Sequence, residues 1–320
     1  MKLNAVILAG TKNYRQFVIG KKKEYKQYLK LCDKYVIEYV IDAVLNAKLV
    51  DKIFIICDKQ KIKQVLKKYS AKQRKRLHII ENKESLMENI NYCFTNYTQK
   101  AILLPSDAPF LKPKDIDSFI KQVNTNKDYV IGFTDGSDLD KIFDKLSLFI
   151  KKERIKYGLF PIYNADIRIS NLHFLDSTKI KKPELNLAQN IFNNRKLLDS
   201  DGRKNTKSWK NIAVACLRYL HQRKYHPAII LGGIIGAFYG VLFYLAHKSR
   251  HYNLGKIYAF LIRPKLMEII IWLLTAGNTK TQIIITKNLS PMLDIDLEEN
   301  YLLLAKNNCS NFKNISKFLI

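Results

Sequence analysis

The sequence predicts an α/β protein with a doubly wound, mostly parallel central sheet. First, short apolar strand-like stretches alternate with segments of helical spacing from residue 5 to residue 123. Second, 320 residues with 47% hydrophobic side chains suffice for a sizeable core. Third, the stretch LLPSDAPFL places Asp107 directly after an apolar run, and ligands of open α/β sheets gather where strands end.

The first half of the chain supplies four strand and helix pairs. The apolar stretch AVILAG (5–10) is a buried strand that ends in Gly10, and a helix with a 3.6-residue apolar spacing follows at 34–49. Ser85 is placed to cap the third of the four helices. The remaining predicted elements are strands at 52–58, 76–82 and 100–107, and helices at 59–69, 85–97 and 113–123. Strands alternating with helices at these spacings favour a parallel sheet.

Beyond residue 125 the pattern is looser. Strand candidates occur at DYVIGF, KYGLFPIY and ISNLHFL, a polar connector covers 183–205, and 208–225 has helical spacing. A last strand is expected at TQIIITKN. We therefore expect residues 1–320 to form a single domain, with residues 205–275 as a helical, strongly apolar insertion before its last strand.

The charge balance is strongly basic, with 55 Lys and Arg against 28 Asp and Glu and a net charge of +27. Such a charge suits a nucleic acid, a membrane surface or polyanionic substrates. However, Lys outnumbers Arg 44 to 11, is spread over the whole chain and accompanies abundant Asn, Ile and Tyr, as a coding bias towards A and T would produce. No nucleic-acid partner is expected, because no DNA or RNA module motif is present.

The five cysteines lie far apart and form no CxxC pair, so we expect neither a zinc site nor a disulfide framework. The N-terminal stretch MKLNAVILAG lacks the length and cleavage site of a signal peptide. These observations predict a protein of the reducing cytoplasm, with a peripheral membrane contact as an open alternative.

Residues 227–246, PAIILGGIIGAFYGVLFYLA, contain no charge and meet the length criterion for a transmembrane helix. Gly232, Gly236 and Gly240 have the small-residue spacing of membrane helix interfaces, and Lys or Arg flank both ends. Three interpretations stay open: a helix buried in the core or covered by a partner, a contact with a membrane surface, and a true span.

The residues around Gly10 and Lys26 suggest a phosphate site. Glycine at a strand end lets the backbone approach a phosphate, and exposed N–H groups together with a lysine can neutralise a triphosphate. The chain carries VILAG, YKQYLKLCDKYVIEYVIDAV, IIENKESLMENINYCF, ILLPSDAPFL and PMLDIDLEENYLLL in this order. Together these motifs resemble the nucleotidyltransferases of the molybdenum-cofactor guanylyltransferase and sugar-phosphate nucleotidylyltransferase type, which implies a central sheet of the GT-A-like or Rossmann-like kind.

The resemblance implies a role for each matching residue. Leu8, Ala9 and Gly10 would hold a nucleoside triphosphate with Lys26, and Asp107 and Asp294 would bind Mg²⁺ or Mn²⁺, with Asp296 as the alternative to Asp294. Ser85 would lie near the base and ribose. Ser170 and Asn171 would border a phosphorylated small-molecule acceptor. A phosphate monoester needs alignment and charge cancellation rather than a general base, so Lys26, Asp107 and Asp294 are the catalytic candidates.

The sequence departs from the family pattern in the phosphate loop and after the last aspartate. Thr11 replaces a second glycine, Arg15 is the only arginine of a Lys-rich loop, and Leu297 stands where threonine is common. Two hypotheses follow. The first is a metal-dependent nucleotidyltransferase that releases pyrophosphate. The second is a non-catalytic binding or membrane-associated protein on the same fold.

Joining Asp294 to Asp107 in one metal site would also constrain the topology. Residues 276–320 and the N-terminal sheet would then lie on one side of any membrane, and a single span at 227–246 would separate them. This argument favours the insertion hypothesis.

Overall fold

The computed structural model describes most of the chain. The described residues are 1–10, 16–19, 21–137, 160–162, 165–178, 186–187, 189–190, 206–248, 257, 259–275, 277, 279–295 and 298–319.

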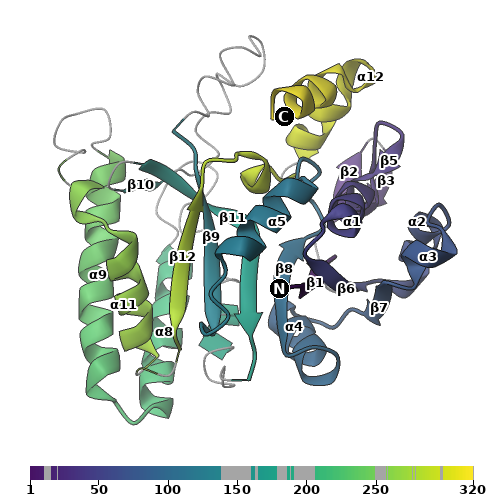
Figure 1. The fold of residues 1–320 in the computed structure, drawn as a ribbon. Coiled ribbons are helices and arrows are strands. Elements are labelled where there is room, and N and C mark those ends of the chain that lie inside the picture. The colour runs from purple at the N-terminus through teal and green to yellow at the C-terminus, as the bar shows by residue number, and fades with distance from the viewer. Residues whose placement is uncertain are drawn as a thin grey trace.

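A mixed, mostly parallel sheet forms the centre of the molecule (Figure 1), which confirms the predicted fold class. Its strands follow the order β12-β9-β11-β8-β1-β6-β7, and β10 pairs with β11 outside this path. All neighbours on the path run parallel except β11, which is antiparallel to β8 and to β9. The strands are β1 (Leu3–Leu8), β6 (Val50–Cys57), β7 (Leu77–Glu81), β8 (Lys100–Pro105), β9 (Tyr129–Asp135), β10 (Phe160–Ile162), β11 (Ala165–Asp176) and β12 (Thr281–Thr286).

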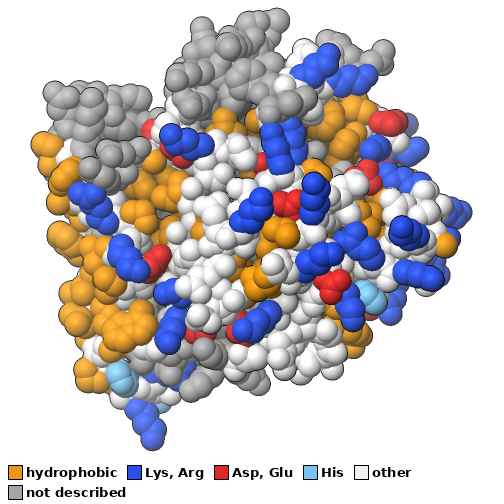
Figure 2. Space-filling model, viewed as in Figure 1, with side chains coloured by type: hydrophobic (Ala, Val, Ile, Leu, Met, Phe, Trp, Pro, Cys, Tyr) orange, Lys and Arg blue, Asp and Glu red, His pale blue; other side chains and the backbone are white. Residues whose placement is uncertain are grey.

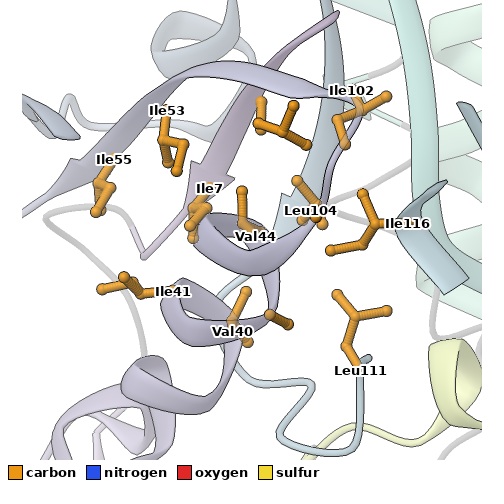
Figure 3. Packing of buried hydrophobic residues seen from close by; sticks show 14 of the residues in the cluster. Ile7, Val40, Ile41, Val44, Ile53, Ile55, Ile102, Leu104, Leu111 and Ile116 are labelled. Carbon is orange, nitrogen blue, oxygen red and sulfur yellow. The ribbon is translucent and has the colours of Figure 1, made fainter. Parts of the chain in front are cut away.

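Helices cover both faces of the sheet. On one face α1, α2 and α5 pack on β1, β6 and β8, and Figure 3 shows Ile7 beside Val44 and Leu104 beside Ile116 in this core. On the other face α4 packs on the same strands, and α9 and α11 pack on β9, β10 and β12. The helices are α1 (Val36–Asn46), α2 (Lys59–Leu66), α3 (Ala71–Arg74), α4 (Leu86–Asn96), α5 (Pro113–Gln122), α8 (Thr206–Gln222), α9 (Pro227–Lys248), α11 (Pro264–Leu274) and α12 (Glu298–Phe318).

The C-terminal helix α12 packs against the N-terminal segment rather than against the sheet. Two short hairpins and a 3₁₀ turn, η1 (Lys26–Tyr28), lie between β1 and α1; the hairpins are β2 (Phe17–Ile19) with β3 (Lys22–Glu24), and β4 (Lys30–Leu31) with β5 (Lys34–Tyr35). Phe312 of α12 lies 4.9 Å, between ring centroids, from Phe110 of the LLPSDAPFL stretch. This satellite core joins both ends of the chain beside Asp107.

A disulfide bond joins Cys32, in the turn between β4 and β5, to Cys309 of α12. The expectation that no disulfide forms is therefore wrong. The two positions are 277 residues apart, so their pairing follows from tertiary packing and not from any local spacing. Disulfides are rare in reducing compartments, and the cytoplasmic location inferred from the sequence stays a prediction.

The range 205–275 contains the helices α8, α9 and α11 between β11 and β12, and its status as an insertion stays a prediction. After these helices β12 returns to the sheet and pairs parallel with β9. Among the residues that the structure describes, no helix is long and apolar enough to cross a membrane.

Two of the glycines at membrane-helix spacing serve packing within the chain. A Cβ at Gly232 would lie 2.8 Å from Leu273 Cβ and 2.9 Å from the backbone nitrogen of Leu274. A Cβ at Gly236 would lie 3.5 Å from Ile270. Gly232 thus lets α9 approach the backbone of α11 closely, which a larger residue would prevent.

We expect Gly232→Ala to lower the free energy of unfolding by about 1–3 kcal/mol, because α9 must move away from α11. Gly233→Ala is the matched control, since a Cβ there meets nothing within 4 Å. Its higher helix propensity should leave stability unchanged or raise it by up to about 1 kcal/mol. Urea denaturation measures both, and equal effects would contradict the close approach of the two helices.

Candidate functional site

The predicted site residues gather at the carboxyl edge of the sheet. β1 and β8 are parallel neighbours, with Leu8 in register with Pro105. Gly10 and Asp107 each follow two residues later, and Ser106 N donates to the carbonyl of Leu8 over 3.2 Å. Parallel strands end at the same edge of a sheet, so the fold places Gly10 of the proposed phosphate site near Asp107 of the proposed metal site.

Asp107 forms a buried ion pair with Lys26. The ammonium of Lys26, in η1, contacts Oδ2 of Asp107, and the two residues are only 5% and 6% exposed. Bulk water hardly solvates either charge at this depth, so each charge is stabilised by the opposite charge beside it. The structure therefore brings together the lysine and the aspartate that the sequence placed 81 positions apart.

The backbone that follows β1 is held by two side chains that sequence reasoning missed. Gln27 Nε2 donates to the carbonyl of Ala9 over 2.9 Å, and Asn89 Nδ2 donates to the carbonyl of Gly10 over 3.2 Å. Gly10 has φ +94°, a conformation that favours glycine. Asn89 Oδ1 also accepts from Lys83 N over 2.6 Å, so this buried amide joins the loops after β1 and β7.

The second predicted carboxylate belongs to Asp294, whose neighbour Ile295 contacts the backbone of Asp107. Ile295 N donates to the carbonyl of Asp107 over 2.9 Å. Oδ1 of Asp294 accepts from a guanidinium nitrogen of Arg168 on β11 over 3.1 Å. The segment after β12 thus brings a second acid to the edge where β8 ends, and β11 brings the arginine that contacts this acid. Asp296 lies outside the described residues.

Asp115 in the first turn of α5 anchors this late segment. Its buried carboxylate accepts from Ser290 Oγ and, over 2.7 Å, from Asn288 Nδ2. Ser290 belongs to the 3₁₀ turn η3 (Ser290–Met292), which also contacts β9 and β11. Asp115 is therefore a positioning residue for Asp294, and the motif order alone did not indicate it.

A pocket of about 250 Å³ opens beside Gln27 at the same edge. It lies where β1, β6 and β7 end, and its lining residues are Ala9, Tyr25, Gln27, Tyr28, Asp58, Glu81 and Asn82. The volume lies near the lower end of the range for small-molecule sites. Polar groups on an aromatic wall suit a planar base with hydrogen-bonding edges.

Two titratable groups at or beside this pocket, the Tyr28 hydroxyl and the Cys57 thiol, have pKa values raised by burial. Burial raises the pKa of the Tyr28 hydroxyl well above its usual range, with a contribution from the negative charge of Asp58. Burial also raises the pKa of the Cys57 thiol to about 12. Tyr28 can therefore serve as a hydrogen-bond donor at neutral pH, and Cys57 is a buried thiol without nucleophilic character.

Ser85 has a structural task in the fold. Its Oγ accepts from Glu88 N over 3.2 Å while the Glu88 carboxylate accepts from Ser85 N over 3.0 Å, which forms a capping box at the start of α4. The side chain is half-buried near the loop that Asn89 organises. Its role towards a nucleotide stays a prediction.

Ser170 and Asn171 lie in the irregular part of β11, between the register positions of Ile169 and His173. Ser170 is 2% exposed, and its Oγ accepts from Leu172 N over 3.2 Å. Nδ2 of Asn171 is buried without a hydrogen-bond partner among the described residues. On this strand it is Arg168 that contacts the predicted metal residue Asp294, and it is a further residue that sequence reasoning missed.

The described residues contain no group of three or more His, Cys, Asp or Glu side chains that could hold a metal ion. Asp107 and Asp294 nevertheless suit Mg²⁺, which typically takes one or two carboxylates and completes its shell with phosphate and water oxygens. Asp107 contacts Lys26, and Asp294 contacts Arg168. These two cations neutralise the carboxylates in place of a metal ion. The phosphate-loop residues Thr11 and Arg15, and Leu297, lie outside the described residues.

Comparison with known proteins agrees with this geometry. Residues 24–161 match the family model of the cytidylyltransferases. This range includes Lys26, Asn89 and Asp107. The match confirms the resemblance to nucleotidyltransferases and the prediction of an enzyme that transfers a nucleotidyl group. The sequence has no significant match among curated proteins.

Solved structures share the fold at low sequence identity. A hypothetical transferase from Thermus thermophilus is 13% identical with a TM-score of 0.58, over 94% of this chain and 100% of the other. A 4-diphosphocytidyl-2C-methyl-D-erythritol synthase from Anaerococcus prevotii DSM 20548 is 10% identical with a TM-score of 0.44, over 95% of each chain. The first of these shows that the two chains share one fold over most of their length.

We expect Asp107→Asn to lower the free energy of unfolding by about 3–5 kcal/mol, because the buried ammonium of Lys26 would lose the negative charge of Asp107. The double variant Lys26→Met with Asp107→Asn should lose clearly less than the two single variants together, since neither charge is then left alone. A double-mutant cycle by urea denaturation measures this coupling. Additive losses would show that the two side chains do not interact.

Proposed function

We propose that this nucleotidyltransferase uses CTP and transfers the cytidylyl group to a phosphorylated small-molecule acceptor, with release of pyrophosphate. The observation that carries the proposal is the buried Lys26–Asp107 pair at the carboxyl edge of the sheet, beside the 250 Å³ pocket. CTP is favoured over the other nucleotides by the cytidylyltransferase family model.

In this proposal the base and ribose occupy the pocket lined by Tyr28 and Asn82, with Ser85 at its rim. The backbone of Leu8, Ala9 and Gly10 faces the phosphates. Gln27 and Asn89 hold this backbone by donating hydrogen bonds to two of its carbonyls, so that the ligand meets a preformed surface.

Lys26 has two anionic partners in the reaction. Without nucleotide it neutralises Asp107, and with nucleotide its ammonium can contact a phosphate while Asp107 contacts a divalent cation. Asp107 and Asp294 would hold Mg²⁺ or Mn²⁺, which supplies charge neutralisation to the phosphates when bound. Arg168, released from Asp294, would then face the acceptor side.

The acceptor would lie over β11, near Asn171 and Arg168, with Ser170 supporting the strand from within. A phosphate monoester is already anionic, so the site needs cations and alignment and no general base. Sugar phosphates, alcohol phosphates and phosphorylated cofactors all share this chemistry. A non-catalytic binding protein on the same fold remains the second candidate, because the phosphate loop departs from the family pattern at Thr11.

A thermal-shift screen with ATP, GTP, CTP and UTP, each with and without Mg²⁺, tests nucleotide binding. We expect CTP at 100 times its Kd to stabilise the protein by about 2.7 kcal/mol. Asp294→Asn should reduce the part of this shift that depends on Mg²⁺. Asp51→Asn, an exposed acid at the start of β6, is the matched control and should behave as the wild type.

Pyrophosphate release with CTP and a panel of phosphorylated acceptors then separates the two candidates. The transferase proposal expects acceptor-dependent release that falls at least about 100-fold in Asp294→Asn, the magnitude typical of lost electrostatic stabilisation. A CTP-induced shift without release for any acceptor would favour the binding protein. Absence of a shift with all four nucleotides would overturn the proposed nucleotide site.

A further inference from the structure

The outward side of α9 carries a stripe of large apolar side chains that no element of the described part of the chain covers. Its residues are Ile230, Leu231, Ile234, Phe238 and Val241, and each is between 43% and 65% exposed. We call this set the apolar stripe. At 3.6 residues per turn these positions fall on the side of α9 opposite Gly232 and Gly236, which face α11. The stripe therefore contributes nothing to the core that holds α9 on the sheet.

Neighbouring helices extend this apolar surface. Leu217 of α8 is 62% exposed, and Trp272 of α11 is 46% exposed. Figure 2 shows hydrophobic side chains gathered along the edge of the molecule that α9 and α11 form. A surface of this extent exceeds the scattered apolar side chains of an ordinary protein surface and indicates an interaction site.

The charges around the stripe are almost all positive. Residues 206–275 contain ten Lys or Arg and one acidic residue, Glu268. That acid is already engaged, because its carboxylate contacts Lys265 Nζ and Ile283 N, each over 2.8 Å. The surface therefore offers positive charge with no free acid to balance it.

The cations stand at both ends of the helical pair. Arg218 and Lys224 are exposed near the start of α9, and Arg263 and Lys265 lie at the start of α11. The guanidinium of Arg263 lies 4.6 Å from the ring centroid of the exposed Phe260. An apolar band between cationic ends matches a bilayer interface, where acyl chains meet anionic headgroups.

We propose that the apolar stripe docks the protein on the surface of an anionic lipid bilayer, with α9 lying along the interface. The stripe enters the acyl boundary, and the flanking lysines and arginines contact lipid phosphates. Because β12 pairs with β9 after these helices, the chain leaves and rejoins one sheet on one side of the bilayer. This inference is independent of the proposed nucleotide chemistry.

Charge complementarity decides between a bilayer and a second copy of the chain. In a symmetric dimer through the stripe, the same cations of two copies would face each other without acids to pair them. An anionic bilayer supplies the opposite charge at both ends of the stripe. The observations thus favour lipid over self-association.

Co-sedimentation with vesicles tests the apolar part of the proposal. We expect binding to vesicles of phosphatidylcholine with 30% phosphatidylglycerol, and at least tenfold weaker binding to phosphatidylcholine alone. The double variant Ile234→Asp with Phe238→Asp should bind at least tenfold more weakly than the wild type. Tyr97→Asp, which removes an aromatic side chain that is 49% exposed at the end of α4, should not change binding.

A charge-matched pair of variants tests the cationic part. Arg218→Glu with Lys224→Glu should weaken binding at least fivefold. Lys72→Glu with Lys75→Glu, on the exposed surface around α3, makes the same change in net charge and should have little effect. Equal losses in the two variants would show attraction by the net charge of the whole protein and would overturn a local docking surface.

Two further outcomes would overturn the proposal. One is the absence of sedimentation with anionic vesicles at 0.1 M salt. The other is a dimer in sedimentation-velocity measurements that Phe238→Asp dissociates, which would assign the stripe to a second copy. Circular dichroism of each variant confirms that it is folded, so a loss of binding is not a loss of structure.

Discussion

The organisation of the site depends on one buried ion pair, Lys26 with Asp107. A charge that is almost excluded from water is tolerable only beside an opposite charge. The pair therefore ties η1 to the end of β8, and through Gln27 it aligns the backbone that leaves β1. The same aspartate accepts Ile295 N at its backbone carbonyl, which brings Asp294 to the edge. Three segments from the start, middle and end of the chain thus converge on one residue.

The ion pair also explains how the proposed nucleotide-binding edge can be stable before a nucleotide binds. Lys26 and Arg168 neutralise the two carboxylates that a metal would otherwise contact. In the proposed function a phosphate would replace Asp107 as the partner of Lys26, and a divalent cation would replace Lys26 as the partner of Asp107. Such a site needs little rearrangement of its backbone. Gln27 and Asn89 hold the backbone after β1, and Asp115 holds the segment after β12.

The two faces of the sheet serve different purposes. The face under α1 and α5 is a closed core, whereas the helices on the other face end in a surface that is apolar and cationic. Gly232 and Gly236 relate the packing of α9 to the apolar surface that it exposes. They allow α9 to pack tightly on α11, and this packing directs the larger side chains of α9 outward.

The sequence by itself determined the alternation of strands and helices, the strand ends that carry Gly10 and Asp107, and the identity of the principal charged residues. Apolar periodicity and strand-end chemistry are local properties, so they are visible without a structure. The antiparallel course of β11 was not predictable in this way, because strand direction depends on partners far away in the chain.

Only the tertiary structure decided the contacts that make these residues a site. Lys26 and Asp107 were predicted as separate ligands of phosphate and metal, and folding made them a pair. Arg168, Asn89, Gln27 and Asp115 carry no motif, since their importance lies in the distant atoms that they reach. The Cys32–Cys309 bond and the contact of Gly232 with α11 likewise depend on residues far apart in the sequence. Long-range contacts are set by how helices and strands pack, and no local pattern of residues records that packing.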